Sequence, residues 1–229
     1  FGVGLYGHLD QDTDLFFKEW KYDFIKVDWC GGEQMKLNEQ EEYTKIINKV
    51  KSIDPNIVFN VCRWQFPGEW AIKIADSWRV SGDISAKFSS ILHIIDLNKN
   101  LYSYASAGHY NDMDMLQVGR GMSYDEDKTH FSMWALLNSP LLAGNDLRSM
   151  SKATIEILTN KEIIALNQDT AFKQAQNIIT EGNIEVWQKM LTKGQKAIAI
   201  MNRCDQEISY TLGTSKLGLN QNTKIRDLW

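Results

Sequence analysis

Short apolar runs alternate with amphipathic stretches over the first two-thirds of the chain. The apolar runs are bounded by Gly, Asp and Asn, and their length is typical of buried strands. Strands are predicted at Gly2–Tyr6, Phe24–Asp28, Ile57–Cys62, Trp78–Val80, Asp112–Leu116 and Leu141–Ala143.

Three of the intervening stretches have helical periodicity. Apolar residues at 43, 46, 47, 50 and 53 share one helical face, as do those at 88, 91, 92 and 95. A third helix carries apolar residues at 131, 134, 135 and 137, with Ser123 as its predicted N-cap and Glu126 three residues later. Strands that alternate with helices in this way are parallel and joined by crossover helices.

Polar side chains gather where these strands end. In a (β/α)₈ barrel that edge carries the active site, whereas a doubly wound sheet gathers function at one crevice. Because nearly every strand ends on a polar residue, we predict an α/β fold, a (β/α)₈ TIM barrel of which strands 3–8 are present. The strand-end residues are Tyr6, Asp28, Arg63, Asp83, Asp114 and Asp146.

The pattern changes after residue 168, where helical periodicity stops. Strands are predicted at Ile184–Lys189, Lys196–Met201 and Ile208–Leu212, with turns at 181–183 and 193–194. We predict an N-terminally incomplete catalytic barrel over residues 1–168. A partial antiparallel β-sandwich domain, also incomplete, is predicted over residues 169–229.

Composition narrows the function classes. A net charge of −4, with Lys and Arg dispersed, gives no reason to expect a nucleic-acid partner. No apolar run approaches the roughly 18 residues of a membrane span, so no membrane partner is expected. Eight Trp and eight Tyr slightly favour sugar binding, because flat aromatic faces pack against sugar rings. The compartment stays open, with a secreted or periplasmic bacterial protein as the expectation, and a homo-oligomer is also left open.

Two carboxylates stand out among the strand ends. Lys26 and Asp28 are spaced by two on an apolar strand and therefore point to the same side, where they form either a functional or a structural ion pair. Asp83 follows Gly82 at another strand end, close to Arg79. A retaining glycosidase needs two such carboxyl groups about 5–5.5 Å apart, one as nucleophile and one as acid/base.

Other chemistries find less support. Residues 2–7 match GxGxxG, with Asp28 about 20 residues on, but these glycines fall inside a predicted strand rather than in the turn before a helix. Residues 10–14 resemble a calcium loop that lacks its Gly and closing Glu, and favour a helix N-terminus instead. The histidines form no metal-binding pattern, so metal-dependent hydrolysis lacks ligands, and no GxSxG motif supports a Ser-His-Asp hydrolase.

Taken together, the longer motifs resemble glycoside hydrolase family 27, the melibiase-type α-galactosidases and α-N-acetylgalactosaminidases. Their order and spacing follow the family over nearly the whole chain. The matching segments lie at 4–6, 26–30 (Lys-Val-Asp-Trp-Cys), 78–84 (Trp-Arg-Val-Ser-Gly-Asp-Ile), 111–116 (Asn-Asp-Met-Asp-Met-Leu), 139–147 and 164–169.

The resemblance implies a role for each of these positions. Asp28 would be the nucleophile and Asp83 the acid/base, in an enzyme that cleaves terminal α-galactosides of oligosaccharides or glycoconjugates by double displacement. It also implies a disulfide between Cys30 and Cys62, and neither a metal nor an organic cofactor. The residues expected to line the sugar pocket are Tyr6, Lys26, Arg63, Arg79, Asp114 and Met115.

Two departures from the family pattern keep alternatives open. The family's first two barrel strands, which carry a Trp and an Asp-Asp pair, are absent from the chain, so a catalytically inactive sugar-binding fragment is the alternative from another class. Family galactosidases usually carry Glu after the cysteine of the fifth strand, where this chain has Arg63. Arg cannot accept a hydrogen bond from the sugar 2-hydroxyl. An α-N-acetylgalactosaminidase or a β-L-arabinopyranosidase therefore remains an alternative.

Overall fold

The computed structural model describes residues 4–220 and 222–229. Its first part contains a parallel sheet in the order β1-β2-β3-β4, with no reversal of the strand order among the described residues. A sequential order of this kind belongs to a barrel wall and not to a doubly wound sheet, which turns back on itself at a switch point. The strands are β1 (Phe24–Asp28), β2 (Val58–Cys62), β3 (Ser77–Arg79) and β4 (Tyr110–Asp112).

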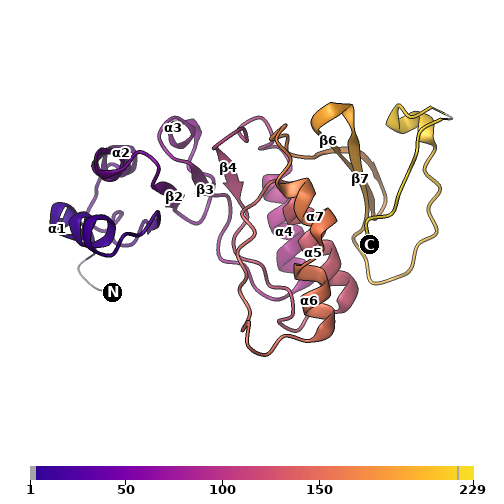
Figure 1. The fold of residues 1–229 in the computed structure, drawn as a ribbon, viewed down its shortest axis with the longest axis horizontal. Coiled ribbons are helices and arrows are strands. Elements are labelled where there is room, and N and C mark those ends of the chain that lie inside the picture. Colours follow the sequence, from indigo (N-terminus) through magenta and orange to yellow (C-terminus); the bar gives the residue numbers. More distant parts are fainter. Residues whose placement is uncertain (1–3, 221) are drawn as a thin grey trace.

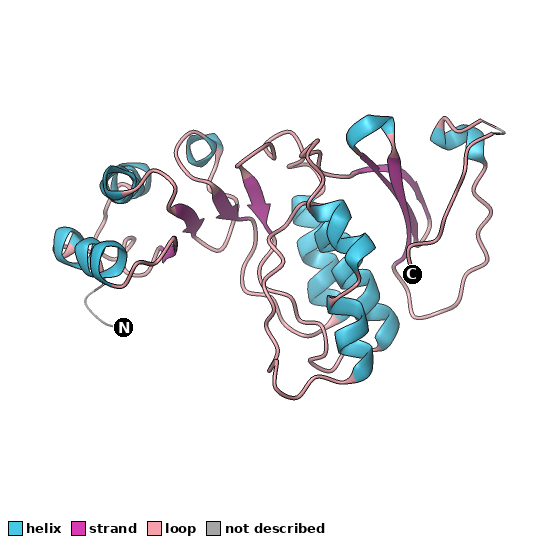
Figure 2. Ribbon diagram, in the orientation of Figure 1, coloured by secondary structure: helices cyan, strands magenta, loops and turns pink. Residues whose placement is uncertain are grey.

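Helices connect these strands along the chain (Figures 1 and 2). All three predicted helices are present, as α2 (Glu39–Ile53), α4 (Phe88–Asn98) and α5 (Tyr124–Leu136). Ser123 and Glu126 form the predicted capping box of α5. The shorter helices are α1 (Leu9–Thr13), followed by a π-helical turn (Asp14–Glu19), α3 (Glu69–Ile72), α6 (Lys152–Leu158) and α7 (Lys161–Asn167).

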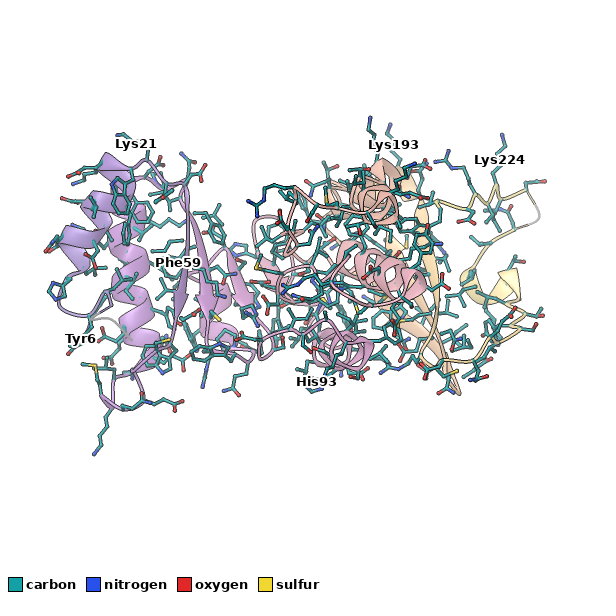
Figure 3. All side chains as sticks on the ribbon, turned by 90° about the horizontal axis from the view of Figure 1, so that it is seen from below. Tyr6, Lys21, Phe59, His93, Lys193 and Lys224 are labelled. Atoms are coloured by element: carbon teal, nitrogen blue, oxygen red, sulfur yellow. The ribbon has the colours of Figure 1, made fainter. Side chains whose placement is uncertain are left out.

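The core lies between the sheet and these helices. Phe59 of β2 is fully buried there, between the strands and the first helices (Figure 3). Tyr43 of α2 is also fully buried, and its hydroxyl oxygen lies 2.9 Å from the carbonyl oxygens of both Val27 and Cys62. Helix α2 is thereby tied to the carboxyl ends of β1 and β2, the edge that carries the predicted site.

Three of the predicted strands differ in the structure. Gly2 and Val3 lie outside the described residues, and residues 4–6 form a turn that leads into α1. The strand predicted from Asp112 to Leu116 runs instead over Tyr110–Asp112, because Asp114 has a left-handed φ of +77° that ends the extended geometry. The predicted strand 141–143 is reduced to a single parallel bridge between Leu116 and Ala143.

The C-terminal part is an antiparallel sheet in the order β5-β6-β7 (Figure 1). Strands β6 (Ile184–Met190) and β7 (Lys196–Asn202) confirm two predictions, while β5 (Gln176–Glu181) was not predicted. The prediction of a strand at 208–212 was wrong, because these residues pair with no described strand and run as an extended loop.

No described helix is long and apolar enough to cross a membrane.

Lys189 links the antiparallel sheet to the end of helix α5. Its side chain is fully buried, and Nζ lies 3.4 Å from the carbonyl oxygens of Ala135 and Leu136 and donates to Oδ1 of Asn138. A cation at this position satisfies carbonyl groups that the last turn of a helix leaves unpaired. Burial lowers the pKa of the Lys189 ammonium to about 8, although the carboxylate of Asp169 acts in the opposite direction.

This burial predicts a pH-dependent stability. Between pH 8 and the ordinary Lys pKa of about 10.4, the unfolded chain holds a proton at Lys189 that the folded chain releases, so stability should rise with pH. The thermal midpoint of Lys189→Met should lack this rise, and the difference between the two proteins should change between pH 8 and pH 10. Parallel midpoint curves over that range would show that Lys189 keeps its ordinary pKa.

Candidate active site

The carboxyl edge of the parallel sheet brings several predicted site residues together. Asp28 ends β1 and lies in register with Cys62, which ends β2. Arg79 ends β3 and lies in register with Asp112 at the end of β4. Because the strands are parallel and in sequential order, all four residues lie at one edge of the sheet.

Arg79 is at the centre of this edge. It is 1% exposed, and its Nη2 lies 2.8 Å from Oδ2 of Asp114 and 3.3 Å from Oδ1 of Asp83. Nη2 also donates to the carbonyl oxygen of Gly82 at 2.9 Å. A buried guanidinium needs such partners to offset its desolvation, so Arg79 is held in one orientation. Asp114 is 12% exposed, whereas the Asp83 side chain is 74% exposed and open to a ligand.

Asp28 and Lys26 form the ion pair that their spacing predicts. Lys26 Nζ lies 3.7 Å from Asp28 Oδ1, and the two side chains are 39% and 42% exposed. The exposed carboxylate is accessible to a ligand, and the ammonium of Lys26 places a positive charge beside it. An exposed pair contributes little to stability, so a purely structural reason for it is weak.

Cys62 lies between Asp28, its register partner, and Arg79, which in turn contacts the Asp83 carboxylate. Burial, together with the neighbouring Asp28 carboxylate, raises the pKa of the Cys62 thiol to about 12, so it stays protonated at neutral pH. On its other side Nη1 of Arg79 lies 3.9 Å from Cys62 Sγ. Contacts therefore run from Asp28 through Cys62 and Arg79 to Asp83, across three neighbouring strands.

The predicted disulfide between Cys30 and Cys62 is not formed, since both cysteines are free. The Cys62 thiol is buried and faces Asp28 and Arg79 on the inner side of the sheet. Cys30 lies in the exposed turn that follows β1. Their side chains therefore face different surroundings, and this prediction was wrong.

A cavity of about 1240 Å³ lies beside β1. Four predicted site residues line it, namely Tyr6, Lys26, Asp28 and Arg63, whereas Arg79, Asp83, Asp114 and Met115 do not. No described strand pairs with β1 on the side away from β2, which explains the size of the cavity. Tyr6 is more than half exposed and lies at the end of the molecule opposite the C-terminal sheet (Figure 3).

Arg63 and Met115 lie at the margins of this edge. Arg63 Nη1 is paired with Oε2 of Glu39 at 2.9 Å, and burial raises the pKa of the Glu39 carboxyl group despite the neighbouring guanidinium. Met115 is exposed next to Asp114, and its backbone N–H donates to Oδ1 of Asp114 at 2.7 Å. The Arg63–Glu39 pair joins residues from different elements and is not encoded in local sequence spacing.

Three polar residues of the sheet interior were not predicted as site residues. The amide of Asn60 donates to Ser77 Oγ at 2.7 Å and to Asp112 Oδ2 at 2.8 Å. All three are buried, and burial raises the pKa of the Asp112 carboxyl group, although the backbone N–H of Asp114 opposes this. A polar Asn inside the apolar run Val58–Cys62 was the available signal, because a buried amide needs a polar partner.

Among the described residues, no three His, Cys, Asp or Glu side chains are grouped to hold a metal ion.

A family model described as alpha galactosidase A matches residues 2–169. The chain belongs to the α-galactosidase A family of melibiases. A second model, described as the alpha galactosidase C-terminal beta sandwich domain, matches residues 181–229. The resemblance to the melibiase-type α-galactosidase family indicated by the sequence motifs is thereby confirmed.

Curated relatives are similar over most of the chain. An α-galactosidase A of Cellvibrio japonicus is 41% identical over 220 residues, which is 90% of this chain and 54% of the relative. Alpha-galactosidase 2 of Arabidopsis thaliana is 40% identical over 231 residues, covering 99% of this chain and 58% of the relative. The chain thus spans about half the length of the curated relatives it matches.

Solved structures share the fold. Alpha-galactosidase I of Mortierella vinacea superposes with a TM-score of 0.80 at 28% identity, over 86% of this chain and 56% of the other. A β-L-arabinopyranosidase of Geobacillus stearothermophilus has a TM-score of 0.81 at 21% identity, over 94% and 53% of the two chains, which shows a shared fold alone. The predicted partial barrel followed by an antiparallel β domain is confirmed.

Proposed function

We propose that this chain carries both catalytic carboxylates of a retaining glycoside hydrolase that removes terminal α-linked galactose. The observation that carries this proposal is the line of contacts from Asp28 through Cys62 and Arg79 to Asp83 at one sheet edge. The names of the relatives support the choice of galactose, because those at 36–41% identity are all α-galactosidases.

The reaction is a double displacement. Asp28 attacks C1 of the sugar while Asp83 donates its proton to the glycosidic oxygen, so the C1–O bond breaks and the aglycone leaves as an alcohol. This gives a β-linked galactosyl ester on Asp28. Asp83, now a carboxylate, takes a proton from water as the water oxygen attacks C1 and the ester bond breaks. Two inversions restore the α configuration in the product.

The surrounding residues support these two roles. Lys26 places a positive charge beside the nucleophile, and Arg79 orients Asp83 by contacting its carboxylate. Asp114, Met115 and Tyr6 bind the sugar around these groups. Arg63, held by Glu39, donates toward the 2-position of the sugar.

A substrate series on the full-length protein tests this proposal. Nitrophenyl α-galactoside should be hydrolysed at least about tenfold faster, in kcat/KM, than the α-N-acetylgalactosaminide, because an Arg side chain leaves less room for the acetamido group. The β-L-arabinopyranoside, which lacks the 6-hydroxymethyl group, should also be slower. Proton NMR should show α-galactose as the first product.

Each alternative has its own outcome in this series. Faster hydrolysis of the N-acetylgalactosaminide or the arabinopyranoside would reassign the substrate. First appearance of β-galactose would replace retention by inversion. Galactose binding without release of product would support a catalytically silent sugar-binding protein and overturn the proposed activity.

A further inference from the structure

Asp114 has an unusual backbone that is held from both sides. Its φ of +77° lies in the left-handed region, which is costly for a residue with a side chain. The N–H of Asp114 donates to Oδ1 of Asp112 at 2.8 Å. Its carbonyl oxygen accepts from the indole Nε1 of Trp134, also at 2.8 Å. Two side chains, from β4 and α5, therefore secure this single residue.

This backbone geometry decides where the Asp114 carboxylate lies. Oδ2 is 2.8 Å from Nη2 of Arg79 and accepts from the backbone N–H of Ile84 at 3.0 Å. Arg79 contacts the Asp83 carboxylate, and Ile84 is the next residue in the chain. Asp114 thus holds the segment around Asp83 in two ways. Its carboxylate pairs with the Arg79 side chain, which contacts Asp83, and it accepts a hydrogen bond from the main-chain N–H of Ile84.

Trp134 is suited to hold this arrangement rigidly. It is fully buried in α5, and its ring packs edge-to-face on His130 with 4.0 Å between centroids. Nε2 of His130 accepts from the backbone N–H of Gln117, which fixes the loop after Asp114 to the same helix. Burial lowers the pKa of His130 to about 3, so the imidazole stays neutral and this contact persists over the working pH range.

We propose that Trp134 is a positioning residue for acid catalysis, whose indole N–H acts through Asp114 to hold Asp83 in place. This inference rests on the proposed glycosidase function. A misplacement of about 1 Å in a reacting group can cost about a hundredfold in rate. The indole N–H is therefore expected to matter for the proton that Asp83 donates, and not only for the packing of α5.

Leaving-group dependence separates this role from a general structural one. In the full-length protein, Trp134→Phe should lower kcat/KM for methyl α-galactoside about 10- to 100-fold, since its methanol leaving group needs protonation. For 2,4-dinitrophenyl α-galactoside, whose leaving group needs no proton, the loss should stay below about threefold. Trp187→Phe is the matched control, because Trp187 is also fully buried and its Nε1 donates to Glu185 at 3.1 Å, away from the site.

A second variant guards against a folding defect in Trp134→Phe. Benzothienylalanine at position 134 replaces the indole N–H by sulfur and keeps the ring shape, so it should give the same selective loss. An equal loss on both substrates, or the same pattern in Trp187→Phe, would overturn the positioning role.

Hydrogen exchange tests the placement without relying on activity. The amide of Ile84, which donates to Asp114, should exchange faster in Trp134→Phe and should be unchanged in Trp187→Phe. If the wild-type protein releases no product, the proposed function has failed, while faster exchange at Ile84 would still support the structural half of the inference. Unchanged exchange at Ile84 in Trp134→Phe would by itself overturn the inference.

Discussion

Replacing Asp28 by alanine is expected to lower galactoside hydrolysis by about 10⁴-fold or more, as removal of a catalytic nucleophile does in other enzymes. The carboxylate is partly exposed at the cavity beside β1 and forms an ion pair with Lys26. The alanine side chain offers no group that can attack C1. The measurement is kcat/KM with nitrophenyl α-galactoside.

Azide identifies the role of Asp28 chemically. In Asp28→Ala, azide fits the space left by the carboxylate and attacks C1 from the same side, so the product should be β-galactosyl azide, inverted relative to the substrate. Asp146→Ala is the control, because Asp146 was also predicted at a strand end but its carboxylate pairs with Arg148 on the surface. An α-configured azide product from Asp28→Ala would contradict the assignment of the nucleophile.

Replacing Asp83 by alanine should lower kcat/KM by about 10²- to 10⁴-fold for methyl α-galactoside, the range that general acid catalysis supplies. With 2,4-dinitrophenyl α-galactoside the first step should remain fast, because that leaving group departs without a proton. The galactosyl–enzyme should then accumulate and appear as a burst of dinitrophenolate in rapid-mixing experiments. The Arg79 contact to Asp114 remains in this variant, so the pocket should keep its shape.

The product formed with azide distinguishes the two carboxylates. In Asp83→Ala, azide should attack the galactosyl ester on Asp28 and give α-galactosyl azide, with net retention. Asp146→Ala should show neither the burst nor the azide product. Equal losses on the methyl and dinitrophenyl substrates in Asp83→Ala would show that Asp83 is not the acid.

Parts of the fold and of the candidate site were predictable because they depend on local periodicity. The run Phe24–Asp28 and the face of α2 carry strong signals, and both elements occur at the predicted residues. Strand β5 was missed because Gln176 and Glu181 bound a short run in which Ile178 and Ile179 are adjacent, which obscures alternation. The strand predicted after Asp112 was misplaced because a left-handed residue inside an apolar run leaves no trace in hydropathy.

The sequence by itself determined which chemical groups stand at the strand ends. Lys26 and Asp28 share one strand by a two-residue repeat, and Asp83 follows Arg79 by four residues after another strand. Only the tertiary structure decided which of these groups meet. Arg79 contacts both Asp83 and Asp114, and Cys62 faces Asp28 rather than Cys30. The physical reason is that hydrophobic periodicity specifies the face on which a side chain lies. Pairing of buried charges depends on distances between strands that are far apart in the chain.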